Sequence, residues 1–178
     1  MHCEQCSGTC QRDRGCGEPL VSTWKGDHPV LDRACQQISP MHPNYATRPI
    51  QDGFSWSSSL AECRFDRLYL VVFRSVRRPT ADLDLLREHD DRAYAEALDS
   101  GGLLRYFKGQ ANEQRECLSF CLWETREQAI EAAGAASHRS AADISVHMYE
   151  SYVLDRYWLK KIATARGERL VFEPFQSA

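Results

Sequence analysis

The sequence predicts an α+β fold in which strands and helices follow the ferredoxin-like order β-α-β-β-α-β, with helices on one face of a four-stranded antiparallel sheet. From residue 67 onward, short apolar runs rich in β-branched and aromatic residues alternate with longer amphipathic stretches. Of the 178 residues, 43% are hydrophobic and 26% are charged, which suits one domain with an extension. Residues 1–62 lack sustained periodicity and are rich in Cys and Pro. We therefore expect an irregular N-terminal arm over residues 1–62 and the folded domain over residues 63–178.

Four apolar runs predict the strands, over residues 67–76, 103–109, 116–124 and 150–162. The first run carries Leu68 and Leu70 on one face and Tyr69 and Val71 on the other. Because both of its faces are apolar, both faces of the sheet are expected to be covered. The segment after the fourth run, residues 163–175, predicts a further short strand at the edge of the sheet.

Two amphipathic stretches predict the helices. The first follows the first strand and ends at a pair of glycines, with Thr80 as its expected N-cap. The second begins at Thr125, which forms a capping-box pair with Gln128. It breaks at Gly134 and restarts near Ser137, so we expect two helical segments there.

With both helices on one face, the opposite face of the predicted sheet carries Leu118, Phe120 and Leu122. Three large apolar side chains on an exposed face favour association. We therefore expect a second copy of the chain to cover this face in a symmetric homodimer.

Charge and composition exclude several classes of partner. The net charge is −3 and the pI is near 6.1, with no basic stripe interleaved with aromatic residues, so we expect no nucleic-acid partner. The polar N-terminus lacks the apolar segment of a signal peptide, and no apolar run approaches the length of a membrane span. The sequence therefore predicts a cytoplasmic protein without a membrane partner, in which cysteines are reduced thiols or metal ligands.

The first sixteen residues contain four cysteines, Cys3, Cys6, Cys10 and Cys16. The gap of two residues between Cys3 and Cys6 suits zinc chelation. The following gaps of three and five residues match neither a zinc knuckle nor a ferredoxin run. The spacing therefore favours an arm without metal, with a structural zinc site, disulfides or an iron–sulfur cluster as alternatives. No catalytic role follows from this segment.

The runs "YLVVFRSVRRP", "LSFCLWETREQA" and "SHRSAA", in this order, resemble the dimeric α+β barrel superfamily, and within it the antibiotic-biosynthesis-monooxygenase-like group. The similarity is to a family of bacterial and fungal proteins and covers residues from about 50 to 165. The superfamily includes cofactor-free monooxygenases, polyketide cyclases, isomerases, haem-degrading enzymes and stress proteins, so the resemblance specifies the fold better than the chemistry. It implies a pocket between the sheet and the helices of each subunit.

The first predicted helix places Asp90 in the middle of its apolar stripe, between Leu86 and Tyr94. A carboxylate that faces the sheet there is partly desolvated, which suits a general acid or base. The alternative is a structural hydrogen bond to an Arg or Tyr of a strand. His89, at the edge of the stripe, is either a further catalytic group or a half-exposed surface histidine.

The second predicted helix restarts at "SHRSAA", which places His138 in its first turn. A helix N-terminus disfavours a cationic imidazolium, so we expect His138 to be neutral and able to accept a proton from an acidic carbon or a phenol. In the superfamily that these residues resemble, a histidine in or near this region serves some members as the base. The alternative is a capping or surface histidine.

Aromatic residues supply the third set of candidates. Tyr106, on the second strand, can hydrogen-bond a carbonyl or a phenolate and joins the catalytic candidates. The residues that we expect to contact a substrate are Tyr94, Trp123, Tyr152, Trp158 and Ser119. Plain packing in the core or at a dimer interface is the alternative for each of them.

Two functions from different classes fit these residues. The first is an enzyme that acts on a hydrophobic polyketide-, terpenoid- or phenol-like metabolite by cofactor-free acid/base chemistry such as cyclisation, isomerisation or dehydration. Because no Gly-rich phosphate loop follows a strand, we expect no nucleotide cofactor. The second is a non-catalytic dimer that binds a ligand or partner. A cofactor-free or haem-linked monooxygenase is a third alternative, and its haem form requires a proximal histidine such as His89 or His138.

Overall fold

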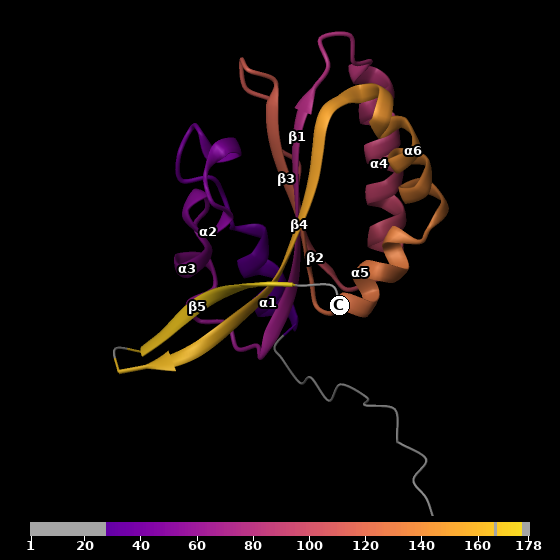
Figure 1. The fold of residues 1–178 in the computed structure, drawn as a ribbon. Coiled ribbons are helices and arrows are strands. Elements are labelled where there is room, and N and C mark those ends of the chain that lie inside the picture. The colour runs from indigo at the N-terminus through magenta and orange to yellow at the C-terminus, as the bar shows by residue number, and fades with distance from the viewer. Residues whose placement is uncertain (1–27, 166, 176–178) are drawn as a thin grey trace, which may run out of the picture.

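The computed structural model describes residues 28–165 and 167–175 and confirms the α+β fold with β-α-β-β-α-β order (Figure 1). Within this part of the chain, the elements in order are α1 (His28–Gln36), the 3-10 helix η1 (Tyr45–Thr47), α2 (Ile50–Gly53), α3 (Trp56–Ser59), β1 (Arg67–Arg77), α4 (Leu83–Ser100), β2 (Leu103–Phe107), β3 (Glu116–Trp123), α5 (Arg126–Ala133), α6 (Ala136–Met148), β4 (Tyr149–Thr164) and β5 (Gly167–Pro174). None of the helices among these residues is both long and apolar enough to cross a bilayer.

The strands of the described residues form one antiparallel sheet in the order β2-β3-β1-β4-β5. The segment after the fourth predicted strand forms β5 at the sheet edge, so the sheet has one strand beyond the ferredoxin-like four. Tyr69 of β1 lies opposite Trp123 of β3 and Trp158 of β4. Cross-strand partners share a face, and successive residues alternate between faces. The register therefore assigns each strand residue to one of the two faces.

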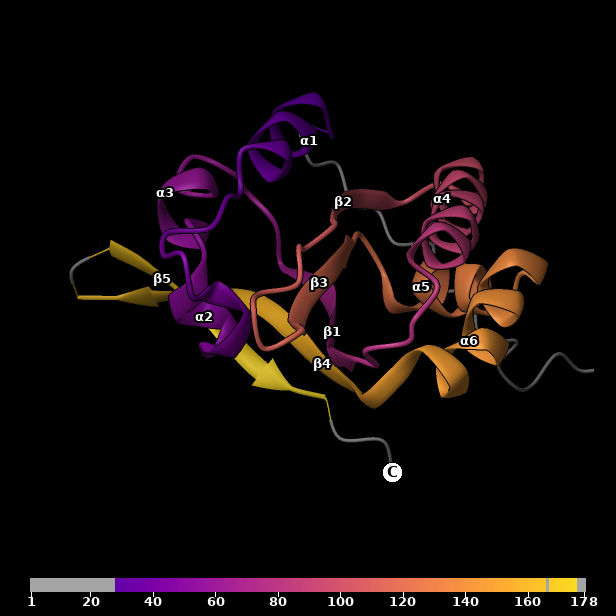
Figure 2. The same ribbon diagram turned by 90° about the horizontal axis from the view of Figure 1, so that it is seen from above.

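Helices α4, α5 and α6 cover one face of the sheet (Figures 1 and 2). Thr125 caps α5 through the predicted capping box with Gln128. The predicted cap of α4 is wrong: Asp82, and not Thr80, accepts hydrogen bonds from the N–H groups of the first turn. An N-cap side chain must stand directly before the first helical residue, and Thr80 lies two residues too early.

Residues 28–65 cover the opposite face of the sheet, where Figure 1 shows α1, α2 and α3. Phe54 and Trp56 are 2% and 1% exposed. Their ring centroids lie 5.2 Å and 5.0 Å from the ring centroid of Phe120 on β3. The indole N–H of Trp56 donates to the carbonyl of Ile50 at 2.8 Å, which satisfies its polar atom inside the core. These short helices and the sheet therefore share one hydrophobic core.

The face on which a second copy was expected is already covered. Leu118, Phe120 and Leu122 are all fully buried by the chain itself. The expectation that this face is open to a second copy is therefore wrong. The reason is that residues 28–65 bury their apolar side chains from several very short helices, which leave no sustained periodicity in the sequence.

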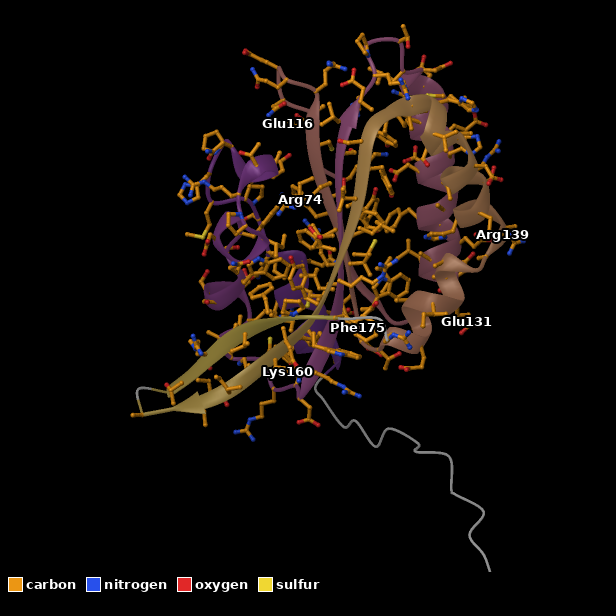
Figure 3. The ribbon with its side chains drawn as sticks, in the orientation of Figure 1. Arg74, Glu116, Glu131, Arg139, Lys160 and Phe175 are labelled. Carbon is orange, nitrogen blue, oxygen red and sulfur yellow. The ribbon has the colours of Figure 1, made fainter. Side chains whose placement is uncertain are left out.

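Arg74 ties this covering layer to the sheet with polar contacts. Its guanidinium, on β1, donates to the carbonyls of Ala46 and Arg48 at 2.8 Å each. It also lies 3.4 Å from the carboxylate of Asp155 on β4. Figure 3 shows Arg74 between the sheet and the covering layer. The charge is thus hydrogen-bonded where the layer meets the sheet, as partly buried charges must be.

Candidate functional site

The carboxylate of Asp90 on α4 contacts two side chains, that of Tyr106 near the end of β2 and that of Lys108 just after β2. Asp90 accepts a hydrogen bond from the hydroxyl of Tyr106. Its other carboxylate oxygen lies 2.6 Å from the ammonium of Lys108, which also lies 2.8 Å from the carboxylate of Asp91. The stripe position of Asp90 on α4 brings it against β2, whereas Asp91 lies on the more exposed side of the helix. The cluster therefore combines a carboxylate, a phenol and an ammonium on the helix-covered face.

Burial shifts the pKa values of the two partners of Asp90 in opposite directions, whereas the charge of Asp90 raises both. Burial, and then the charge of Asp90, raise the pKa of Tyr106 well above its usual range, so its hydroxyl keeps its proton. Partial burial lowers the pKa of Lys108, but the hydrogen bonds and charges of Asp90 and Asp91 outweigh burial and raise the pKa overall. Near neutral pH the cluster therefore contains a neutral phenol and a charged ammonium.

His138 lies in the first turn of α6, the helix that packs on α4. Its Nδ1 is 3.9 Å from the carboxylate of Glu96 on α4, which is too long for a hydrogen bond. The same carboxylate accepts the backbone N–H of Ser137 at 2.8 Å and so joins the two helices. Burial lowers the pKa of His138 below its ordinary value of 6.5, and the charges of Glu96 and Asp90 oppose this change without cancelling it. His138 is therefore neutral at physiological pH.

The lowered pKa of His138 predicts a pH dependence of stability. The folded state holds the imidazole neutral in a range where the unfolded chain binds a proton, so stability falls as the pH drops below 6.5. We expect His138→Gln to lose less unfolding free energy than the wild type between about pH 7.5 and about pH 5.5, measured by urea unfolding. The control His147→Gln changes an exposed histidine of the same helix and should behave as the wild type. Equal losses in wild type and His138→Gln would contradict the assignment.

The helix-covered face of the sheet is less completely buried than the other face. On β1, Leu70 and Val72 point toward residues 28–65 and are fully buried. Val71 and Phe73 point toward the helices and keep partial exposure. On β4, Leu154 lies opposite Phe73 and is 36% exposed. An accessible apolar surface therefore adjoins the Asp90 cluster on the same face of the sheet.

Among the predicted substrate contacts, Tyr94 and Tyr152 lie on this surface. The ring centroid of Tyr94 is 5.2 Å from that of Tyr106. The ring of Tyr152 packs at 5.2 Å from Tyr149 and at 6.4 Å from Phe73. Burial, followed by neighbouring groups that include Asp90, raises the pKa of Tyr152, so the structure brings both tyrosines near the Asp90 cluster.

The other predicted contacts have partners of their own. Trp123 is 3% exposed and fills the apolar core beneath α5. Trp158 packs at 5.2 Å from the ring of Tyr69. The hydroxyl of Ser119 accepts the backbone N–H of Gly109 at 3.1 Å. These contacts are those of packing and turn stabilisation, the alternative interpretation of these side chains.

His89 makes a polar contact of its own with α6. Its Nδ1 is 3.2 Å from the hydroxyl of Ser140 on α6. This contact joins α4 to α6 through exposed side chains.

Sequence reasoning did not select Lys108 and Glu96. Lys108 stands two residues after Tyr106, so the two-residue period of a strand places both on one face. Glu96 lies directly beside Ala97, a member of the apolar stripe of α4, but no local pattern links it to His138. The spacing could have indicated Lys108, whereas only the packing of α4 on α6 reveals the role of Glu96.

The cysteines considered as an alternative zinc site, Cys3, Cys6, Cys10 and Cys16, lie outside the described residues. A surface hollow of about 300 Å³ lies between α3 and the β4–β5 hairpin. Lys161 lines this hollow, and its side chain is largely buried. Its ammonium lies 3.3 Å from the carboxylate of Glu168 and donates to the carbonyl of Ala61 at 2.9 Å. We assign no site to this hollow.

Solved structures with a similar fold include proteins of the group that the sequence resembles. A protein from Nitrosomonas europaea assigned to the antibiotic-biosynthesis monooxygenases has a TM-score of 0.46 and 10% identity, covering 55% of this chain and 92% of its own. Rv0793 from Mycobacterium tuberculosis has a TM-score of 0.45 and 17% identity, covering 55% and 98%. SnoaB, a cofactor-independent oxygenase from Streptomyces nogalater, has a TM-score of 0.42 and 11% identity, covering 52% and 92%.

Sequence comparison identifies the family. UPF0643 protein PB2B2.08 of Schizosaccharomyces pombe is 30% identical over 100 residues, which are 53% of this chain and 46% of that relative. The alignment thus spans about half the length of the relative. The family model described as PB2B2.08-like matches residues 20–172, which include all of the helices of the described residues and nearly all of the sheet. The chain therefore belongs to the PB2B2.08-like family.

Proposed function

We propose that this protein is an enzyme that transfers protons on a hydrophobic, phenol- or polyketide-like small molecule without a bound cofactor. One observation carries the proposal: an acid–base cluster of Asp90, Tyr106 and Lys108, with the neutral His138 on the neighbouring helix, adjoins an accessible apolar surface. Environments that push the protonation of nearby groups in opposite directions divide acid and base roles. Small-molecule sites combine an apolar lining with a few convergent polar groups.

In this proposal His138 is the base. Its imidazole is neutral and can take a proton from an acidic carbon or a phenol of the substrate. The imidazolium that forms is stabilised by the carboxylate of Glu96, 3.9 Å from Nδ1. The same imidazolium returns the proton in a later step, as cyclisation, isomerisation and dehydration each require.

Lys108 supplies the complementary charge in this proposal, and Tyr106 helps to hold Asp90 in place. Loss of a proton leaves negative charge on an enolate or phenolate oxygen of the substrate. The ammonium of Lys108 stabilises such an oxyanion, and Asp90 holds that ammonium in place at 2.6 Å. Tyr106 keeps its proton and orients the carboxylate of Asp90 through their hydrogen bond, so we assign it a positioning role.

A non-catalytic ligand-binding protein is the second candidate, and one observation favours it. Both carboxylate oxygens of Asp90 already have partners, Tyr106 and Lys108. A carboxylate that is held from two sides is also the arrangement of a structural anchor between a helix and a strand. In that case the apolar surface would bind a ligand without changing it.

A turnover screen tests the proposal. Chelator-treated protein is incubated with anthrones, naphthols and β-polyketone esters, and the reaction is followed by absorbance and by oxygen consumption. We expect saturable turnover of at least one class, with kcat reduced about 10²- to 10⁴-fold in His138→Ala. The control His147→Ala, an exposed residue of the same helix, should retain wild-type kcat. Compounds that raise the melting temperature but are never converted would instead support the ligand-binding candidate.

A further inference from the structure

A β-bulge at the start of β4 brings two tyrosines to one face of the sheet. The register with β1 shifts there, so that Arg77 lies opposite Tyr149 and Glu150 is the extra residue of β4. Without the shift, Tyr149 and Tyr152 would point to opposite faces, because they are three residues apart. The shift places both on the helix-covered face, where their ring centroids lie 5.2 Å apart. Bulges of this kind re-aim side chains and are frequent beside functional sites.

Arg77, the last residue of β1, shares this face. Its cross-strand partner is Tyr149, and cross-strand partners lie on the same face. Cys117 lies opposite Ser75 of β1, also on the helix-covered face. Burial raises the pKa of the Cys117 thiol, and the nearby charge of Arg77 opposes this change without cancelling it. The guanidinium of Arg77 therefore lies beside a neutral thiol and the phenol of Tyr149.

No carboxylate balances the charge of Arg77 within the described part of the chain. Its Nε is buried and forms no hydrogen bond there. The neighbouring arginines Arg74 and Arg115 each have a carboxylate partner, at 3.4 Å and 2.7 Å. A partly buried charge without an oppositely charged partner costs stability, so packing alone gives no reason for an arginine at this position.

Arg77 and His138 lie on opposite sides of Asp90. Helix α4 begins shortly after β1 ends and runs back along the sheet (Figure 1). Asp90 lies nearer the start of α4, and Glu96, beside His138, lies one to two turns further on, about 9 Å along the axis. Besides burial, the charge of Asp90 acts on the pKa of both Tyr149 and His138. An elongated molecule on this face can therefore extend from Arg77 past Asp90 toward His138.

We propose that the substrate of this site is a carboxylic acid, whose carboxylate is bound by Arg77 and the hydroxyl of Tyr149. This inference rests on the proposed function and names the class of substrate that the site accepts. A guanidinium binds a carboxylate through parallel, charge-assisted hydrogen bonds. A carboxylate held at Arg77 directs the rest of the molecule along the apolar surface toward Asp90 and His138.

The surroundings of Arg77 fit such a ligand. Burial raises the pKa of Tyr149, so its hydroxyl keeps its proton and can donate to a carboxylate. The rings of Phe73 and Tyr152, with centroids 6.4 Å apart, provide an apolar wall beside it. Tyr152 is 43% exposed, which leaves this end of the surface open to solvent. The subsite thus combines one cation, one neutral donor and an accessible apolar wall.

A single negative charge suits this end of the site better than a double one. Arg77 is one cation, Tyr149 is neutral, and the carboxylate of Asp90 on the same face repels further negative charge. A phosphate monoester carries a charge of about −1.5 to −2 near neutral pH, whereas a carboxylate carries one. The charges therefore favour a carboxylate over a phosphate.

Binding of a matched acid and ester to the full chain tests the inference. The acid is a hydroxynaphthoic acid whose hydroxyl and carboxyl groups stand at opposite ends of the ring system, and its methyl ester is the neutral counterpart. We expect the wild type to bind the acid at least about 10-fold more tightly than the ester at about pH 7.5, measured by isothermal titration calorimetry. In Arg77→Met this preference should disappear. The control Arg78→Met changes the adjacent, exposed arginine and should keep the wild-type preference.

A second measurement separates binding from folding. Arg77→Met keeps an unbranched side chain and removes a charge that no carboxylate balances, so its urea midpoint should equal or exceed that of the wild type. A midpoint well below that of the wild type would assign the guanidinium a structural role and overturn the inference.

Three binding results would also overturn it. The first is a wild type that binds the acid no more tightly than the ester, or binds neither. The second is a preference for the acid that persists in Arg77→Met. The third is tighter binding of the corresponding naphthyl phosphate than of the acid, which would contradict the assignment of a carboxylic acid.

The binding measurements and the turnover screen can fail separately. Acid binding that depends on Arg77, without turnover of any compound, would support this inference and contradict the proposed function. Turnover of neutral compounds, without a preference for the acid, would support the proposed function and overturn this inference.

Discussion

Trp56→Ala is expected to lower the free energy of unfolding by about 3–5 kcal/mol, measured by urea denaturation. The indole is 1% exposed, and its ring centroid lies 5.0 Å from Phe120 of β3 and 5.4 Å from Phe172 of β5. Removal of the ring therefore leaves a cavity between the covering layer and the sheet. It also leaves the carbonyl of Ile50 without the hydrogen bond that it accepts from the indole N–H.

The control for Trp56→Ala is Ser57→Ala, which changes the next residue of the same short helix. Ser57 is exposed, and we expect a change within about 0.5 kcal/mol. If Trp56→Ala costs less than about 1 kcal/mol, residues 28–65 do not belong to the cooperative core of the sheet. A large loss would show that this layer takes over the burial that a second copy was expected to supply.

Asp90→Asn is expected to lower kcat about 10²- to 10⁴-fold, measured on a substrate that the turnover screen identifies. The substitution keeps the shape of the side chain and an oxygen that accepts the hydrogen bond of Tyr106. It removes the negative charge that holds Lys108 at 2.6 Å, so the ammonium is no longer fixed beside the reacting oxygen. Because the pair is partly exposed, we expect a stability loss of about 1 kcal/mol or less.

Asp91→Asn is the matched control for this prediction. Asp91 is adjacent, pairs with the same Lys108 at 2.8 Å and is more exposed than Asp90. We expect it to retain most of the wild-type kcat. The charge of Asp90 also raises the pKa of His138, so Asp90→Asn should lower that pKa further, measured by NMR titration of the imidazole. Full turnover in Asp90→Asn, or a large stability loss with unchanged kcat, would assign Asp90 a structural role only.

Local periodicity was sufficient to predict the secondary structure of residues 67–175. The apolar runs of β1 and β3 and the helical stripe of α4 depend on neighbours only a few positions apart. The cap of α5 follows from Thr125 and Gln128, three residues apart. The helix-facing position of Asp90 follows in the same way from the stripe, because it depends only on the geometry of one helix.

Contacts between distant residues required the tertiary structure. Trp56 packs on Phe120, and His138 lies beside Glu96, although each pair is far apart in the sequence. No local spacing of residues indicates such contacts. The sequence suggested an arm that wraps the domain, but it could not show that residues 28–65 bury the sheet face expected for a second copy, because their helices are too short to show a period.

The part of β4 that does not pair with β5 also shows what sequence and tertiary structure each determine. The sequence by itself determined that residues 150–162 form a strand. Only the tertiary structure decided that, among the described residues, β5 pairs with β4 as far as Tyr157 and leaves Tyr152, Val153 and Leu154 partly exposed. The physical reason is that a strand is a local conformation, whereas its pairing register is set by the neighbours that the whole chain brings beside it.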